Sequence, residues 1–172
     1  AIEGVKKRIP VVAQTGSQSL ADTIKLTKHA NKVGADALLV VTPYYIRPPQ
    51  RGLIAYYNEV CRCTDLPVLI YHIPGRTAVN VTIDTVTQIR ESSPNLIGMK
   101  HAVNDLGFCS DLIKKFGMDF RIFVGLEELS FPMMAVGACG LMNAVSNLVP
   151  KTVAEMCESC LLYTSPSPRD RG

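Results

Sequence analysis

The sequence lacks any long hydrophobic run and carries little net charge. No apolar stretch approaches the roughly 18 residues that a membrane-spanning helix requires, so no such span is predicted. The net charge is only +3, and no basic stripe interleaves with aromatic residues. This composition argues against nucleic acid or an anionic membrane surface as a partner. The first eight residues are polar and helix-like, so no signal peptide is predicted there.

Nucleotide-binding and metal-binding motifs are also missing. Neither G-x-G-x-x-G nor G-x-x-x-x-G-K-[ST] follows any apolar run. The six cysteines are irregularly spaced, and Cys61-Arg62-Cys63 is C-x-C with no histidine at a ligand spacing. We therefore expect reduced thiols, a cytoplasmic location and no metal, with a metal site or a disulfide as the alternatives. Hydrophobic residues make up 47% of the 172 residues, which is typical of a globular domain.

A repeating unit organises the chain. Short apolar runs are predicted as six strands: Ile9–Ala13, Ala37–Thr42, Val68–Ile73, Leu96–Lys100, Arg121–Gly125 and Gly140–Val145. Helix-like segments lie between or after them: Leu20–Val33, Arg51–Cys63, Thr82–Arg90, Asp105–Phe116, Leu129–Val136 and Lys151 onward. Strands that alternate with helices of this length form right-handed βαβ units, and so predict a parallel sheet.

Two architectures contain such a sheet, an open doubly wound sheet and a (β/α)8 barrel. The missing nucleotide motifs weaken the first. In a barrel, functional groups gather at the carboxyl ends of the strands. The predicted strand ends carry polar or aromatic groups: Thr15-Gly16, Thr42-Pro43-Tyr44-Tyr45, Tyr71 to Arg76, Lys100-His101, Gly125-Leu126-Glu127 and Asn143. We therefore predict an α/β fold, specifically a (β/α)8 TIM barrel.

Lys100, Tyr71 and Arg76 together suggest a reaction on a keto acid. An amine enclosed in a barrel mouth loses solvation, which favours its neutral form, and a neutral amine attacks a ketone to form an imine. A tyrosine hydroxyl can relay the protons that imine chemistry moves, and an arginine binds a carboxylate bidentately. The alternatives are a solvated strand end for Lys100, a core tyrosine for Tyr71 and a surface loop arginine for Arg76.

Four motifs, "VTPYY", "YHIPGRT", "IGMKHA" and "GLMNAVSNLVP", resemble the dihydrodipicolinate synthase / N-acetylneuraminate lyase family of class I pyruvate aldolases. Their order and spacing match from Ile9 to about Met156, and the arginine of "YHIPGRT" is typical of the synthase branch. The resemblance implies a truncated barrel in which about strands 3–8 are present. A threonine pair that completes the proton relay in the family belongs to a strand before "IPVVAQTG".

The resemblance also implies roles for individual residues. Lys100 would form the Schiff base with pyruvate, and Tyr71 would relay protons. Tyr45 would reach into the site of a neighbouring subunit, which implies a homodimer or homotetramer. Arg76 would hold a carboxylate at the pocket mouth. Two further residues, Gly125 and Met142, would line the pyruvate pocket.

The implied activity is that of a lyase in lysine and diaminopimelate biosynthesis. It would condense pyruvate with L-aspartate 4-semialdehyde to 4-hydroxy-tetrahydrodipicolinate, without a metal or organic cofactor. The family commonly has an acidic residue after the lysine and Asp-Asp after the glycine, where this chain has His101 and Leu126-Glu127. The alternatives are therefore a paralogous pyruvate-dependent aldolase of sugar-acid or aromatic catabolism, and a non-catalytic barrel that binds a keto acid. We expect His101 to be a packing residue and His72 to face a helix.

The two ends of the chain differ from the rest. Residues 1–159 are predicted as a partial TIM-barrel catalytic domain. Residues 160–172 are predicted as a non-native tail, because Cys160 to Asp170 resembles a translated sequencing adapter and breaks the helical pattern. With six predicted strands the barrel cannot close, so we expect little synthase activity from the 172-residue chain itself.

Overall fold

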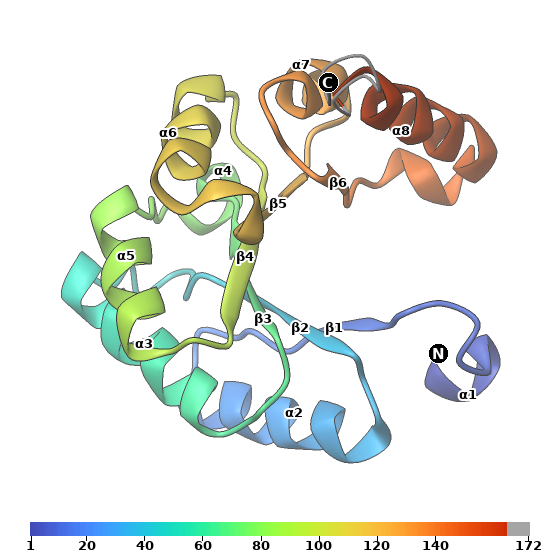
Figure 1. The fold of residues 1–172 in the computed structure, drawn as a ribbon. Helices are drawn as coiled ribbons and strands as arrows, with labels where there is room; N and C mark the ends of the chain where they lie inside the picture. The colour runs from blue at the N-terminus through green and yellow to red at the C-terminus, as the bar shows by residue number, and fades with distance from the viewer. Residues whose placement is uncertain (165–172) are drawn as a thin grey trace, which may run out of the picture. The chain divides into compact units, whose positions relative to one another are not determined.

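The chain folds into two compact units, as described by a computed structural model. The structure describes residues 1–164, with side chains described to residue 160. The first unit is Ala1–Met99 and the second begins at Lys100. Strand β4 (Leu96–His101) crosses the boundary and contributes to both (Figure 1).

The first unit alternates strands with helices. Its further strands are β1 (Val12–Gln14), β2 (Ala37–Val41) and β3 (Val68–His72). Its helices are α1 (Ile2–Val5), α2 (Leu20–Val33), α3 (Gln50–Arg62), α4 (Pro74–Thr77) and α5 (Ile83–Ser92). Strand β2 pairs in parallel with β1 and with β3, so the strand order follows the chain. The predicted parallel βαβ units are therefore present in this unit.

Local sequence signals set the helix ends of the first unit. The Ser19 side chain accepts a hydrogen bond from the Asp22 amide and begins α2, and Gly34 ends it with a left-handed φ of 87°. Thr82 begins α5 in the same way, by accepting from the Thr85 amide. Helix α3 packs against both α2 and α5 along one side of the strands (Figure 1). These helices bury the strand side chains that the sequence predicted to be covered.

The core of the first unit lies between β2, β3 and these helices. Its fully buried side chains include Leu38, Val40, Leu53, Tyr57, Val68, Ile70, Val86 and Ile89. The buried phenol of Tyr57 donates to the Val40 carbonyl oxygen at 2.9 Å. That bond satisfies a polar group that would otherwise destabilise the core, and it ties α3 to β2.

The second unit continues the same alternation. It contains the end of β4, then β5 (Arg121–Val124) and β6 (Gly140–Leu141), which pair in parallel. Its helices are α6 (Leu106–Phe116), α7 (Ser130–Ala135) and α8 (Pro150–Thr164), with 3-10 turns η1 (Gly117–Asp119), η2 (Glu127–Leu129) and η3 (Val145–Asn147). Helix α7 packs against α6 and α8. Its core side chains are Cys109, Leu112, Ile122, Val124, Met133 and Met134.

Two predicted strands are shorter in the structure. The run Ile9–Ala13 contributes a strand only from Val12, because Pro10 has no amide hydrogen and Ile9 is exposed. Strand β6 ends at Leu141 although a strand was predicted to Val145. Ladder-type bonding stops with the Met142 amide, which donates to the Val124 carbonyl oxygen at 2.8 Å. Beyond it the chain turns into η3.

The predicted tail begins inside a helix. Helix α8 is continuous to Thr164, so no helix end marks residue 160. The remainder of the predicted tail, residues 165–172, lies outside the described residues. The division at residue 160 stays a prediction.

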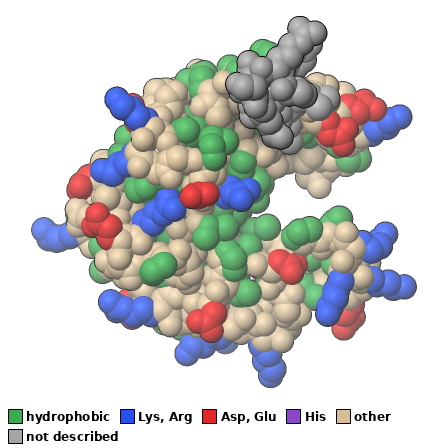
Figure 2. All heavy atoms as spheres, viewed as in Figure 1, with side chains coloured by type: hydrophobic (Ala, Val, Ile, Leu, Met, Phe, Trp, Pro, Cys, Tyr) green, Lys and Arg blue, Asp and Glu red, His purple; other side chains and the backbone are tan. Residues whose placement is uncertain are grey.

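The described surface and helices agree with the low net charge and the missing hydrophobic runs. On the face shown in Figure 2, acidic and basic side chains are interspersed. Among the described helices, none has the length and apolar character to cross a membrane.

Candidate active site

In the first unit, the parallel pairing of β2 and β3 places Tyr71 next to the start of the loop that carries Tyr44 and Tyr45. Val41 and Tyr71 are register partners, and the Thr42 amide donates to the Tyr71 carbonyl oxygen at 3.3 Å. The carboxyl ends of β2 and β3 are therefore adjacent. Tyr71 is half-buried there, as the predicted position at a strand end requires.

Arg76 and Tyr45 line one cavity at these strand ends. The cavity is about 340 Å³ and is lined by Tyr44, Tyr45, Arg47, Arg76, Thr77 and Ala78. Two arginines and no acidic residue line this space, so the charge of its lining favours an anion. Sequence reasoning identified Arg76 and missed Arg47, which follows the tyrosine pair by two residues and has no distinguishing motif of its own.

Three residues that line this cavity have left-handed backbone conformations. The φ angles are 66° at Tyr45, 42° at Arg47 and 54° at Ala78. Non-glycine residues adopt this region at a cost, and such strain tends to cluster where a site demands a particular geometry. The Tyr45 side chain is 86% exposed. Its predicted role in a neighbouring subunit stays a prediction.

Two buried threonines, Thr42 and Thr77, connect the end of β2, which precedes Tyr44 and Tyr45, to helix α4, which carries Arg76. The Thr42 hydroxyl donates to the Thr77 hydroxyl oxygen at 3.1 Å, and the Thr77 hydroxyl donates in turn to the Ile73 carbonyl oxygen at 3.2 Å. The Val79 amide also donates to the Thr77 hydroxyl oxygen, at 3.3 Å. The Thr77 hydroxyl thereby uses its one hydrogen and both lone pairs. This network fixes α4, on which Arg76 lies, against the end of β2.

In the second unit, Lys100 lies against Gly125. The Gly125 amide donates to the His101 carbonyl oxygen at 2.9 Å, which joins the ends of β4 and β5. A Cβ on Gly125 would lie 3.0 Å from Lys100 Cε and 2.7 Å from Ala102 Cβ. Only glycine leaves room here for the half-buried lysine stem. Met142, bonded to Val124, lies at the same strand ends.

Glu127 connects the loops after β5 and β6. Its Oε1 atom accepts hydrogen bonds from the Ala144 amide at 2.8 Å and the Val145 amide at 3.1 Å. Hydrogen bonds from its own backbone amide and from those of Val145 and Ala144 lower the pKa of the Glu127 carboxyl, with a smaller contribution from the Lys100 charge. The sequence placed this acid among the strand-end groups, but the bonds across 17 and 18 residues could not be read from it.

The two histidines predicted to pack are both buried. His72 Nε2 accepts a hydrogen bond from the Val81 amide at 3.2 Å. The His101 ring stacks on Phe108 of α6 with a centroid separation of 5.1 Å and an interplanar angle of 17°. Burial lowers the pKa of His101, with opposing contributions from Asp105. The predicted packing role of His101 is confirmed.

This burial makes stability depend on pH. Since the pKa of His101 is lower in the folded protein, the unfolded protein binds more protons in the acid range, and stability falls as pH drops below about 6.5. We expect His101→Asn to reduce the loss of stability between pH 7.5 and pH 5, by up to about 1.4 kcal/mol per pH unit. Urea unfolding followed by circular dichroism measures this. The exposed His29→Gln variant is the control, and equal pH slopes for His101→Asn and the parent would contradict the expectation.

Two cysteines, Cys61 and Cys109, lie in the core. Burial raises the pKa of Cys61 to about 12 and that of Cys109 to about 11, so their thiolates are scarce at neutral pH. Among the residues that the structure describes, no group of three or more His, Cys, Asp or Glu side chains is placed to hold a metal.

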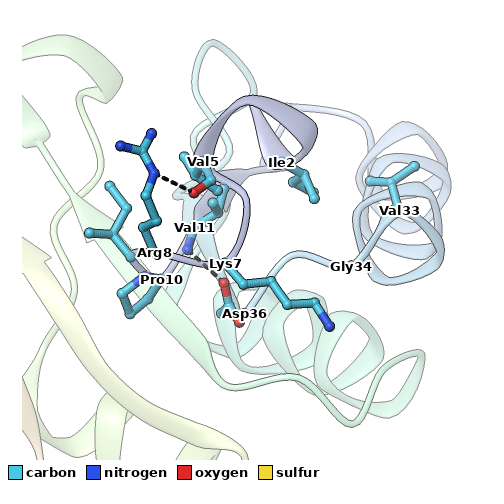
Figure 3. A pocket seen from close by; sticks show the side chains of 10 residues that line it. Ile2, Val5, Lys7, Arg8, Pro10, Val11, Val33, Gly34 and Asp36 are labelled. Atoms are coloured by element: carbon cyan, nitrogen blue, oxygen red, sulfur yellow. Dashed lines mark hydrogen bonds between the residues drawn. The ribbon is translucent and has the colours of Figure 1, made fainter.

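A second cavity lies at the opposite strand ends. It is about 450 Å³, is lined by residues of the N-terminal segment, and includes Asp36, whose carboxylate accepts from the Val11 amide at 2.7 Å (Figure 3). Val11 precedes β1 and Asp36 precedes β2, so this cavity is at the amino ends of the strands. In barrel enzymes the amino ends contribute to stability and the carboxyl ends to chemistry. We therefore place the candidate site at the carboxyl ends.

Comparisons with known proteins agree on one family. The family model described as "Dihydrodipicolinate synthetase family" matches residues 1–161. The 4-hydroxy-tetrahydrodipicolinate synthase of Thermus thermophilus is 44% identical over 161 residues, which is 93% of this chain and 54% of that protein. The chain therefore spans about half the length of the curated relatives it matches.

Solved structures show the same similarity. The dihydrodipicolinate synthase of Aquifex aeolicus superposes with a TM-score of 0.92 at 35% identity, covering 99% of this chain and 57% of that one. The chloride-inhibited dihydrodipicolinate synthase of Acinetobacter baumannii, complexed with pyruvate, has a TM-score of 0.90 at 35% identity. The match covers 99% of this chain and 57% of that one. Together with the parallel strand pairing, these similarities confirm the predicted truncated (β/α)8 barrel.

Proposed function

Because the chain belongs to the dihydrodipicolinate synthetase family, we propose that it carries the active-site half of a Schiff-base lyase. The reaction would be condensation of pyruvate with L-aspartate 4-semialdehyde to 4-hydroxy-tetrahydrodipicolinate. The observation that carries the proposal is Lys100, half-buried at the carboxyl end of β4 and packed on Gly125. The activity is proposed for a protein that also has the segments its relatives possess beyond this chain.

The proposed chemistry begins at Lys100. Its neutral amine attacks the keto carbon of pyruvate, water leaves and an imine forms. Loss of a proton from the pyruvate methyl group gives an enamine, whose carbon attacks the aldehyde carbon of the second substrate. The amine of that substrate then displaces Lys100 and closes the ring, which returns the free lysine. Every step balances without a metal or organic cofactor.

Protons must move at each of these steps, and Tyr71 is the proposed relay. It lies at the end of β3, where a half-buried hydroxyl can exchange protons with a bound substrate. Gly125 and Met142 are proposed to line the pyruvate pocket in the second unit, beside Lys100 and at the end of β6 respectively.

The cavity that contains Arg76 is proposed to bind the carboxylate of the aldehyde substrate. Its lining has two arginines and no acidic group, which suits a carboxylate. Tyr45 also lines it and is 86% exposed, which is compatible with a homodimer or homotetramer in which this side chain serves a neighbouring site. A cytoplasmic location is proposed from the irregular spacing of the six cysteines, which fits no disulfide framework.

Imine trapping tests the proposed function. The full-length protein is incubated with pyruvate and borohydride, and peptides are analysed by mass spectrometry. We expect one reduced pyruvate adduct, located on Lys100. A folded protein with no adduct there would contradict the lyase proposal, and would leave a keto-acid-binding barrel as the better description.

Comparison of aldehydes then identifies the second substrate. L-Aspartate 4-semialdehyde should give the highest kcat/KM if the protein is a synthase, whereas a sugar-acid or aromatic aldehyde should do so if it is a paralogous aldolase. His101 stands where the family commonly has an acidic residue. This difference bears little on the choice of aldehyde, because the His101 ring packs on Phe108 of α6. Leu126-Glu127 directly follows Gly125, which contacts the Lys100 stem, so this difference from the family pattern bears more on the choice of aldehyde.

A further inference from the structure

The loop after β6 is held by a side chain and not by a strand. Beyond Met142 the chain has no ladder partner, and the amides of Ala144 and Val145 both donate to Glu127 of η2. Glu127 follows Gly125 by two residues. One carboxylate therefore sets the separation between the loop that contacts Lys100 and the loop that follows Met142.

The two hydrogen bonds converge on one atom. Both amides donate to Oε1 of Glu127, at 2.8 and 3.1 Å. A neutral amide oxygen in the same place has two lone pairs and could accept both bonds. Glutamine can therefore retain the two bonds in a weaker, neutral form, whereas alanine removes them.

Glu127 lies on the surface and is held there by these bonds. Its side chain is exposed, as is that of Glu128 beside it, so the two hydrogen bonds and not burial fix its carboxylate. Gly125, two residues before it, contacts the Lys100 stem. The connection therefore reaches from the loop after β6 to the wall of the Lys100 site.

We propose that Glu127 is a positioning residue of the lyase reaction, which holds the loops after β5 and β6 together beside Lys100 through its two hydrogen bonds. This inference rests on the proposed function of Lys100. It assigns Glu127 no direct contact with substrate. It predicts that pyruvate binding weakens in proportion to the loss of these two bonds.

Glu127→Gln tests the strength of the connection. Hydrogen bonds to a charged acceptor are stronger than those to a neutral one, so the glutamine variant should raise the KM for pyruvate about 2–3-fold while kcat changes less. A residue that served folding alone would lower stability and leave this KM unchanged.

Glu127→Ala tests the loop connection. Loss of both hydrogen bonds should raise the KM for pyruvate about 10-fold through misplacement of the pocket walls. Glu128→Gln is the matched control, because it removes an adjacent exposed acid and should leave this KM unchanged. Circular dichroism verifies folding, and Glu127→Gln still tests the proposal if Glu127→Ala fails to fold.

The outcomes separate this inference from the proposed function. If the parent protein forms no adduct on Lys100, the proposed function fails. If the parent forms it and folded Glu127→Gln has the parent KM for pyruvate, the assignment of Glu127 is overturned while the lyase stands. An unchanged pyruvate KM in folded Glu127→Ala would equally overturn it.

Discussion

Lys100→Arg is expected to abolish the pyruvate adduct and to lower turnover by on the order of 10⁴-fold or more. Arginine keeps the positive charge and most of the stem, but its guanidinium does not lose a proton at neutral pH and cannot attack a ketone. Lys100 is half-buried and packs on Gly125, so the arginine side chain would start from the same strand end. The measurement is trapping with borohydride, combined with steady-state assay of the full-length protein.

The control for this variant is another lysine of the same unit. Lys115, exposed in the last turn of α6, can be replaced by arginine without touching the candidate site, and Lys115→Arg should retain both adduct and turnover. Circular dichroism must show that Lys100→Arg is folded. An adduct of normal yield in Lys100→Arg would mean that a different amine forms the imine, and would remove Lys100 from the proposed mechanism.

Gly125→Ala is expected to slow adduct formation about 100-fold and to reduce stability by about 1–3 kcal/mol. The new methyl group would lie 2.7 Å from Ala102 Cβ and 3.0 Å from Lys100 Cε. The lysine stem can bend away, but Ala102 is buried and its Cα, 3.2 Å away, belongs to the backbone. The least costly adjustment therefore displaces the Lys100 side chain from its position. Rates of trapped adduct and urea midpoints measure the two effects.

A matched glycine provides the control. Gly140 begins β6, and a Cβ there would meet the Phe123 ring at 3.5 Å, an ordinary van der Waals contact. Gly140→Ala should therefore keep the parent rate of adduct formation. If Gly125→Ala formed the adduct as fast as Gly140→Ala, the contact between Gly125 and the Lys100 stem would not position the amine.

Much of the fold could be predicted from the sequence because its signals are local. Helix α2 has the predicted bounds, since Ser19 and Gly34 supply both end signals within the segment itself. The central strands β2 and β3 were predicted to within one residue, because their apolar runs are continuous. The errors among the strands fall at the start of β1 and the end of β6, where hydrogen-bonding partners and not apolar character decide the strand's limit.

The candidate site was predicted less completely. Lys100 and Tyr71 lie at the carboxyl ends of clear strands, which followed from periodicity, and the family motifs implied their roles. Arg76 lies beyond β3 on α4, a short helix that the sequence did not predict. Arg47 was missed because its presence in the Arg76 cavity depends on left-handed backbone at Tyr45 and at Arg47 itself. No local pattern indicates such a conformation in non-glycine residues.

The sequence by itself determined the alternation of strands and helices, the helix ends and which side chains stand at the strand ends, because each depends on residues within a few positions of one another. Only the tertiary structure decided which of those ends meet. The contact of Gly125 with Lys100 and the bonds from Ala144 to Glu127 join residues that are far apart in the chain. Contacts of this kind depend on strand register and loop path, which form only when the sheet is assembled.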